Sequence, residues 1–144
     1  MHAAFQSWVT WALLAALFAA LTAVLAKIGV SNVNSNFATF LRTLVVVVAL
    51  GILVLSTGQT QPLSTLSGKT GVFLVLSGLA TGASWLCYFR ALQLGKVSQV
   101  APIDKLSVVF VAVIAAVFLG EGLSVTGWVG IALIALGAGL VALA

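Results

Sequence analysis

The sequence contains little charge. Only 6% of its 144 residues are charged, and only two residues are acidic, Asp104 and Glu121. An ordinary soluble domain has about 25% charged residues. Because so few polar side chains cannot cover a water-facing surface, we expect lipid to surround most of the exterior. The composition therefore excludes an ordinary soluble protein.

Residues on which many active sites depend are also scarce. Cys87 is the single cysteine, so a disulfide within the chain is impossible and thiolates cannot form a metal site. The one histidine, His2, lies at the N-terminus, which excludes a serine–histidine dyad at membrane depth. The one aspartate, Asp104, cannot form a pair of aspartates that share a proton, and no Gly-x-x-x-x-Gly-Lys segment indicates ATP hydrolysis. We expect no enzymatic activity, no metal and no cofactor.

Long hydrophobic runs make up most of the chain. Hydrophobic residues account for 62% of it, and the mean hydropathy is +1.29. The runs are continuous over about twenty residues, the length of a transmembrane helix, whereas barrel strands alternate in polarity over about ten residues. We predict one all-α domain over residues 1–144, an integral membrane bundle of about five helices. The expected helices cover about residues 5–27, 36–57, 70–93, 98–119 and 124–144.

Short polar segments separate these runs. Ser and Asn residues between positions 29 and 36 favour a turn or a helix N-cap, and residues 57–70 are expected to form a loop. Gly95 supplies a stop for the third helix. Pro102 either kinks the fourth helix or belongs to its first turn.

Six Lys and Arg residues give a formal net charge of +4. They are scattered singly, without the basic cluster that a nucleic acid requires, so we expect no nucleic-acid partner. They are more frequent after the first and third expected helices than after the second, which favours an inside C-terminus. The bias is small and also permits insertion in both orientations. We expect a multi-pass protein of the plasma (inner) membrane.

Ionisable residues inside the runs are the first candidates for a functional site. Each costs about 2.5–3.5 kcal/mol at a helix centre unless it is paired, hydrated or able to reach the interface. Lys27 lies at a helix end and can reach the headgroups, but Arg42, Arg90, Asp104 and Lys105 are less easily explained. We hypothesise that Asp104 pairs with Lys105, Lys27 or Arg42 near the mouth of a central cavity. The alternative is an interfacial ion pair that fixes the depth of the helix.

The third hydrophobic run carries hydroxyl groups on one stripe. Ser77, Thr81, Ser84 and Tyr88 recur at three- and four-residue spacing, next to Trp85. The stripe could line a substrate path. Hydroxyl groups can equally bond to the preceding turn of their own helix.

Small residues at four-residue spacing predict close contacts between helices, because van der Waals packing drives helix association in lipid. Gly78 and Gly82 form such a pair in the third run, and Ala135 and Gly139 form one in the fifth. The alternative is that alanine and glycine are simply common in membrane helices.

The C-terminal half contains several recognisable motifs. They are YFRALQLGKVSQVAPI at 88–103, FLGE at 118–121 and GWVGIALI at 127–134. Weaker matches are AKIG at 26–29 and Phe-Ala-x-x-x-Arg at 37–42. Together they resemble the EamA repeat of the drug/metabolite transporter superfamily over nearly the whole chain. Asp104 and Lys105 stand where many members have less charged residues, which suggests a subgroup of single-repeat proteins.

The resemblance implies a secondary transporter or exporter of small organic solutes such as metabolites, amino acids or drugs. Most members carry two repeats of opposite orientation, whereas this chain carries one. One repeat supplies half of the walls of a central site, so we expect a homodimer, parallel or antiparallel, or a partner subunit. The alternative function is a non-transporting membrane subunit of a larger assembly, such as a lipid-linked sugar flippase.

The related small multidrug resistance proteins depend on a glutamate in their first helix, and that residue is absent here. Asp104 is the one remaining acid that could replace it in proton coupling. The residues that we expect near the substrate pathway are Lys27, Arg42, Ser84, Trp85, Tyr88, Arg90, Pro102, Asp104 and Lys105.

Overall fold

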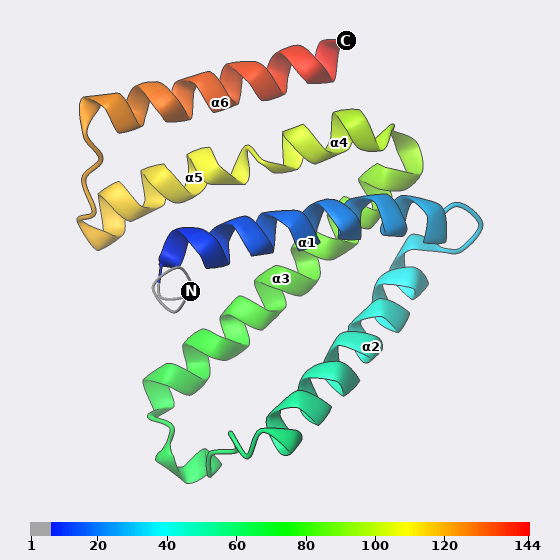
Figure 1. Cartoon of the computed structure of the whole chain (residues 1–144), viewed down its shortest axis with the longest axis vertical. Helices are drawn as coiled ribbons and strands as arrows, with labels where there is room; N and C mark the ends of the chain where they lie inside the picture. Colours follow the sequence, from blue (N-terminus) through cyan, green and yellow to red (C-terminus); the bar gives the residue numbers. More distant parts are fainter. Residues whose placement is uncertain (1–6) are drawn as a thin grey trace. The chain divides into compact units, whose positions relative to one another are not determined.

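The structure, a computed structural model, describes residues 7–144, and all regular elements in that range are helical (Figure 1). The long helices are α1 (Trp8–Gly29), α2 (Ser35–Ser56), α3 (Gly68–Leu94) and α6 (Val125–Leu143). A further apolar span, Val97–Leu119, comprises α4 (Val97–Asp104), α5 (Ser107–Ile114) and the π-helical turn η3 (Ala115–Leu119). All five spans are long and apolar enough to cross a bilayer. The predicted all-α membrane fold is confirmed.

Some helix bounds differ from the sequence prediction. Residues 5 and 6, where the first helix was expected to begin, and His2 lie outside the described residues. The expected loop at 57–70 contains a short 3-10 helix, η2 (Leu63–Thr65), and α3 already begins at Gly68. The fourth expected helix, at 98–119, is interrupted between Asp104 and Ser107, shortly after the proline at which the sequence allows a kink.

The chain forms two compact units. We call the first the terminal unit, which comprises the described part of Met1–Ala26 together with Leu94–Ala144. The second, the central unit, is Lys27–Gln93 and contains the end of α1, the turn after it, α2 and nearly all of α3.

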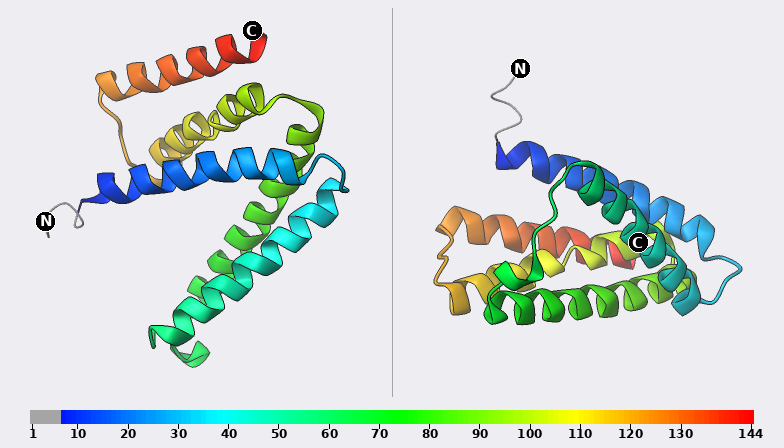
Figure 2. Two further views of the ribbon diagram at one scale, coloured as in Figure 1. Left: turned by 45° about the vertical axis from the view of Figure 1, so that its right-hand side comes forward. Right: turned by 90° about the horizontal axis from the view of Figure 1, so that it is seen from below.

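In the terminal unit, α6 packs against α4 and α5 and runs alongside them in all three views (Figures 1 and 2). The buried side chains of α5 and α6 are small: Ala112 on α5 and Ala138 on α6. Without a hydrophobic drive in lipid, small residues allow backbones to approach and gain van der Waals contact. Ala135 and Gly139, the predicted packing pair, are half-buried on α6.

Pro102 lies inside α4, three residues before the interruption of the fourth span begins. It is the sixth residue of α4, so it lies beyond the first turn and inside the helix. Proline has no N–H to donate, and its ring clashes with the carbonyl one turn earlier. Over the next residues the backbone uses shorter-range bonds, with the Leu106 N–H donating to Ile103 O at 3.0 Å and the Val108 N–H to Lys105 O at 3.0 Å. Of the two predictions for Pro102, the position in the first turn is wrong, and the kink stays a prediction.

Gly120 ends the same span in a left-handed conformation, with φ of +69°. Its N–H and that of Glu121 both donate to Ala115 O, which closes the π-helical turn. Left-handed backbone favours glycine because a Cβ would crowd the neighbouring carbonyl. Ser124 then caps α6, since its Oγ accepts a hydrogen bond from the Gly127 N–H at 3.2 Å.

In the central unit, Asn34 caps α2. Its Oδ1 accepts hydrogen bonds from the N–H groups of Asn36 at 2.9 Å and Phe37 at 3.3 Å. These bonds satisfy donors that the first turn of a helix leaves unpaired. The polar segment at 29–36 therefore forms the turn and N-cap that the sequence predicts.

Candidate functional site

Arg42, in the second turn of α2, lies over two aromatic rings of α3. Its Cζ atom is 3.6 Å from the centroid of the Trp85 ring and 5.6 Å from that of Phe89. A planar guanidinium at 3.6 Å lies with its face against the indole, where the negative face of the ring attracts the cation. Such a contact contributes about 0.5–2 kcal/mol. It offsets part of the cost of placing an arginine inside an apolar span.

The turn between α1 and α2 is bonded to the C-terminal end of α3. The ammonium of Lys27 donates to Leu92 O, one of the last carbonyls of α3, which no N–H of the same helix reaches. Cations are favourable at this end because the helix dipole is negative there. Val30 in the turn and Leu92 on α3 are fully buried. This contact fixes the position of α3 relative to the start of α2 within the central unit.

Gln93 completes the connection. Its Nε2 donates to Val33 O at 2.7 Å and to Val30 O at 3.2 Å, so one amide group satisfies two carbonyls of the turn. Its Oε1 accepts from Nη1 of Arg90 at 3.1 Å. The Arg90 side chain is exposed but held in place by this bond.

All charged residues of the central unit are basic. Residues 27–93 include Lys27, Arg42, Lys69 and Arg90 and contain no Asp or Glu. Lys27 and Arg90 donate to oxygens of their own unit, as described above. Arg42 contacts ring faces, and its unit contains no carboxylate to receive its N–H groups.

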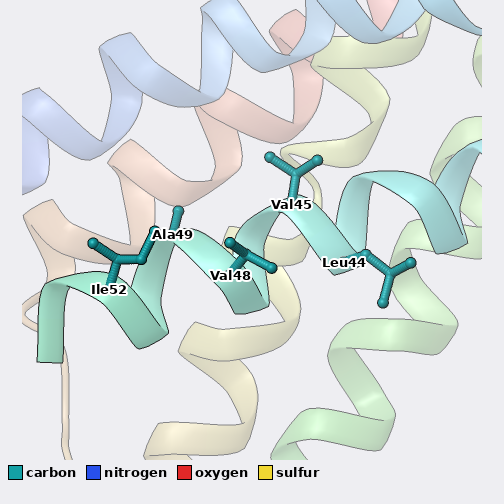
Figure 3. A pocket seen from close by; sticks show the side chains of 5 residues that line it. All are labelled: Leu44, Val45, Val48, Ala49 and Ile52. Carbon is teal, nitrogen blue, oxygen red and sulfur yellow. The ribbon is translucent and has the colours of Figure 1, made fainter. Parts of the chain in front are cut away.

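An apolar hollow of about 370 Å³ lies along α2 just beyond Arg42 (Figure 3). Its lining residues are all on α2 and all apolar: Leu44, Val45, Val48, Ala49 and Ile52. Helical spacing places Val45 and Ala49, three and seven residues after Arg42, on the same side of α2 as the arginine. We call these five residues the α2 groove.

The terminal unit contains the second charged site. Asp104 is the last residue of α4, and its Oδ2 lies 3.1 Å from Nζ of Lys105, at the point where the fourth span is interrupted. Within this unit Lys105 is therefore the partner of Asp104, and a pairing with Lys27 or Arg42 of the other unit stays a prediction. The exposed fractions of the Lys105 and Asp104 side chains are 56% and 36%, so both remain accessible.

The remaining predicted pathway residues lie on α3. Trp85 and Tyr88 are half-buried, whereas Ser84 is exposed. In the hydroxyl stripe, Thr81 Oγ1 donates to Ser77 O at 2.9 Å, so for this residue the bond to the preceding turn is the observed arrangement. Whether these side chains line a pathway stays a prediction.

Gly78 and Gly82, predicted to pack against another helix, meet no such neighbour inside the central unit. Beyond the adjacent residues and the nearby backbone of α3 itself, a Cβ added at either position would meet no heavy atom of the described residues within 4 Å. The packing prediction stays a prediction that concerns surfaces outside this unit.

Two residues of the site were not identified from the sequence. Phe89 is buried, and in the sequence it is one of many apolar residues of the third run. In the sequence, Gln93 is simply the last residue of the expected third helix. A signal was present, since an amide at a helix terminus in a largely apolar chain needs partners of its own.

Comparisons with known proteins agree with this architecture. A model of the EamA-like transporter family matches residues 6–143. A protein of Sinorhizobium sp., named "Uncharacterized transporter in cobO 3'region", is 58% identical over 137 residues, which cover 95% of this chain and 97% of that protein. No solved structure matches the chain. Because the family model spans nearly all of the sequence, this multi-pass membrane protein belongs to the EamA-like transporter family.

Proposed function

We propose that this protein is a secondary transporter that moves small organic solutes, such as metabolites, amino acids or drugs, across the plasma (inner) membrane. The observation that carries the proposal is the interrupted fourth span with the Asp104–Lys105 pair at its break. Membrane transporters use broken helices of this kind to bring backbone groups and charges to a substrate or coupling-ion site. An ionisable pair within a span is costly to maintain, which favours a functional role.

The family membership supports the same role, and so does the relative whose name describes a transporter. The α2 groove and the Arg42–Trp85 contact supply apolar and charged surface for a solute. Asp104 is proposed to carry the coupling proton, since it is the one acid inside the predicted spans.

We further propose that two copies, or one copy and a partner half, form the complete transporter. A polar pathway must be shielded from lipid on all sides, and a single repeat supplies half of the walls. The open faces at Gly78 and Gly82 are suited to close contact with a second subunit. Two-fold assembly is the commonest symmetry for identical subunits.

Solute accumulation in liposomes tests the coupling role. Purified full-length protein is reconstituted, and uptake of labelled amino acids is measured with and without an imposed proton gradient. We expect Asp104→Asn to remove the response to the gradient, because the amide cannot carry a proton. The matched control is Glu121→Gln, which alters the other acid, in the exposed turn after η3. A gradient response unchanged by Asp104→Asn would contradict the role of this residue.

Crosslinking tests the assembly. Cys87 is exposed on α3, so a bifunctional thiol reagent can join two copies through it. We expect a crosslinked dimer in native membranes that is absent from Cys87→Ser. A crosslinked product with a different polypeptide would indicate a partner half instead.

A further inference from the structure

We propose that Arg42 and the α2 groove together bind an amphiphilic organic anion, whose carboxylate or phosphate pairs with Arg42 and whose apolar body lies along α2. The inference rests on the proposed transport function and assigns it a class of solute. It is carried by the contacts of Arg42, by the charge of the central unit and by the position of the groove.

The contact with Trp85 orients the arginine for a ligand. The face of the guanidinium lies against the indole at 3.6 Å, so its five N–H groups point outward along the plane of the group. This fork matches the two oxygens of a carboxylate or phosphate, which accept paired hydrogen bonds. A side chain held in one conformation loses less entropy when it binds.

The net positive charge of the central unit favours binding of an anion. The unit carries four cations and no acid, so its charge is not balanced by its own residues. Lys27 and Arg90 also lie near the end of the unit where the α1–α2 turn meets α3. Their field adds to that of Arg42 and favours a negative group there.

The α2 groove determines the length and polarity of the part of the ligand that does not contact Arg42. Five apolar side chains line it, and they extend over about 12 Å of helix from Leu44 to Ile52. Its lining offers no polar group to a solute, so an apolar body of roughly this length fits. Each CH₂ group buried there strengthens binding about fourfold. A small hydrophilic anion would gain only the contact with Arg42.

Tryptophan fluorescence tests the proposal with octanoate as the probe. The full chain carries Trp8→Phe, Trp11→Phe and Trp128→Phe, so that Trp85 is the remaining fluorophore, and it is reconstituted in phosphatidylcholine vesicles. We expect octanoate to change the emission in a saturable manner. We expect octanamide, which lacks the charge, and acetate, which lacks the apolar body, to bind at least about tenfold more weakly.

Variants separate the two parts of the site. Arg42→Gln is expected to weaken octanoate binding about tenfold or more, and Arg42→Lys to give an intermediate loss because the planar fork is gone. Ala49→Leu fills the groove and is expected to weaken octanoate binding even if Arg42→Gln does not fold. Lys69→Gln, a cation at the start of α3, is the matched control and is expected to bind normally.

Three outcomes would overturn the proposal. The first is equal binding of octanoate and octanamide. The second is octanoate binding that neither Arg42→Gln nor Ala49→Leu weakens. The third is an emission change that depends on Arg42 but requires phosphatidylglycerol in the vesicles instead of octanoate. The third would assign Arg42 to a lipid headgroup. The test needs no flux, so its failure is distinct from failure of the transport function. A protein that transports solutes but does not bind octanoate refutes this inference alone.

Discussion

The guanidinium of Arg42 on α2 lies 3.6 Å from the centre of the Trp85 ring on α3, so a charged side chain joins two apolar spans of the central unit. The contact combines a cation that needs stabilisation in an apolar span with the aromatic residue best able to provide it. Both helices are otherwise covered with exposed apolar side chains. Arg42 therefore has a structural role in addition to the proposed binding role.

A double-mutant cycle measures that structural role. Trp85→Leu, Arg42→Gln and the double variant are compared with the parent by thermal unfolding in detergent, followed by circular dichroism. We expect a coupling free energy of about 0.5–2 kcal/mol between the two positions. Trp8→Leu, at the exposed start of α1, serves as the control. Additive effects of the two substitutions would show that the ring does not stabilise the cation.

Gly120→Ala isolates the effect of backbone conformation. A Cβ added at Gly120 or Gly122 would meet no described atom within 4 Å beyond the adjacent residues, but only Gly120 of the two has a positive φ. We expect Gly120→Ala to destabilise the protein by about 1–2 kcal/mol and Gly122→Ala to have little effect. The unfolding temperatures of both variants provide the comparison. Similar values for the two would mean that the left-handed turn after η3 is not needed.

Gln93→Met tests the connection between the α1–α2 turn and α3. Methionine has a similar length but cannot donate to Val30 O and Val33 O. Each lost hydrogen bond costs about 1 kcal/mol, so the turn is expected to open more often. Amide hydrogen exchange of residues 29–35 measures this directly. Exchange in the 57–67 loop, which makes no bond to Gln93, is expected to remain unchanged.

Pro102→Ala tests the role of the break in the fourth span. Alanine restores the N–H and favours a helix interior by up to about 3 kcal/mol relative to proline. We expect slower amide exchange at residues 102–107 and a lower transport rate, because a continuous helix no longer presents the Asp104 carboxylate at a break. A variant with slower exchange and an unaltered rate would separate the break from transport.

The fold could be predicted in most respects because lipid imposes strong rules on sequence. Continuous apolar runs have to be helices, and Asn34 and Pro102 act on their own backbone neighbours, so their effects were foreseeable. The contact between Arg42 and Trp85 was not, although both were candidates for the pathway. It depends on how α2 and α3 lie against each other, and the small side chains that guide such packing leave few traces in one sequence. The hydrogen bonds of Gln93 could not be predicted for the same reason, because its acceptors are carbonyls of a turn in another part of the chain.

The most direct measurement is uptake into liposomes that contain this polypeptide and no other protein. The account predicts that labelled organic anions enter in a saturable manner, faster than into protein-free liposomes, and that an excess of unlabelled solute competes. A purified chain that moves none of a panel of anions, amino acids and drugs, yet is recovered from membranes in a stable complex with other proteins, would contradict it. Such a result would identify the chain as a non-transporting subunit.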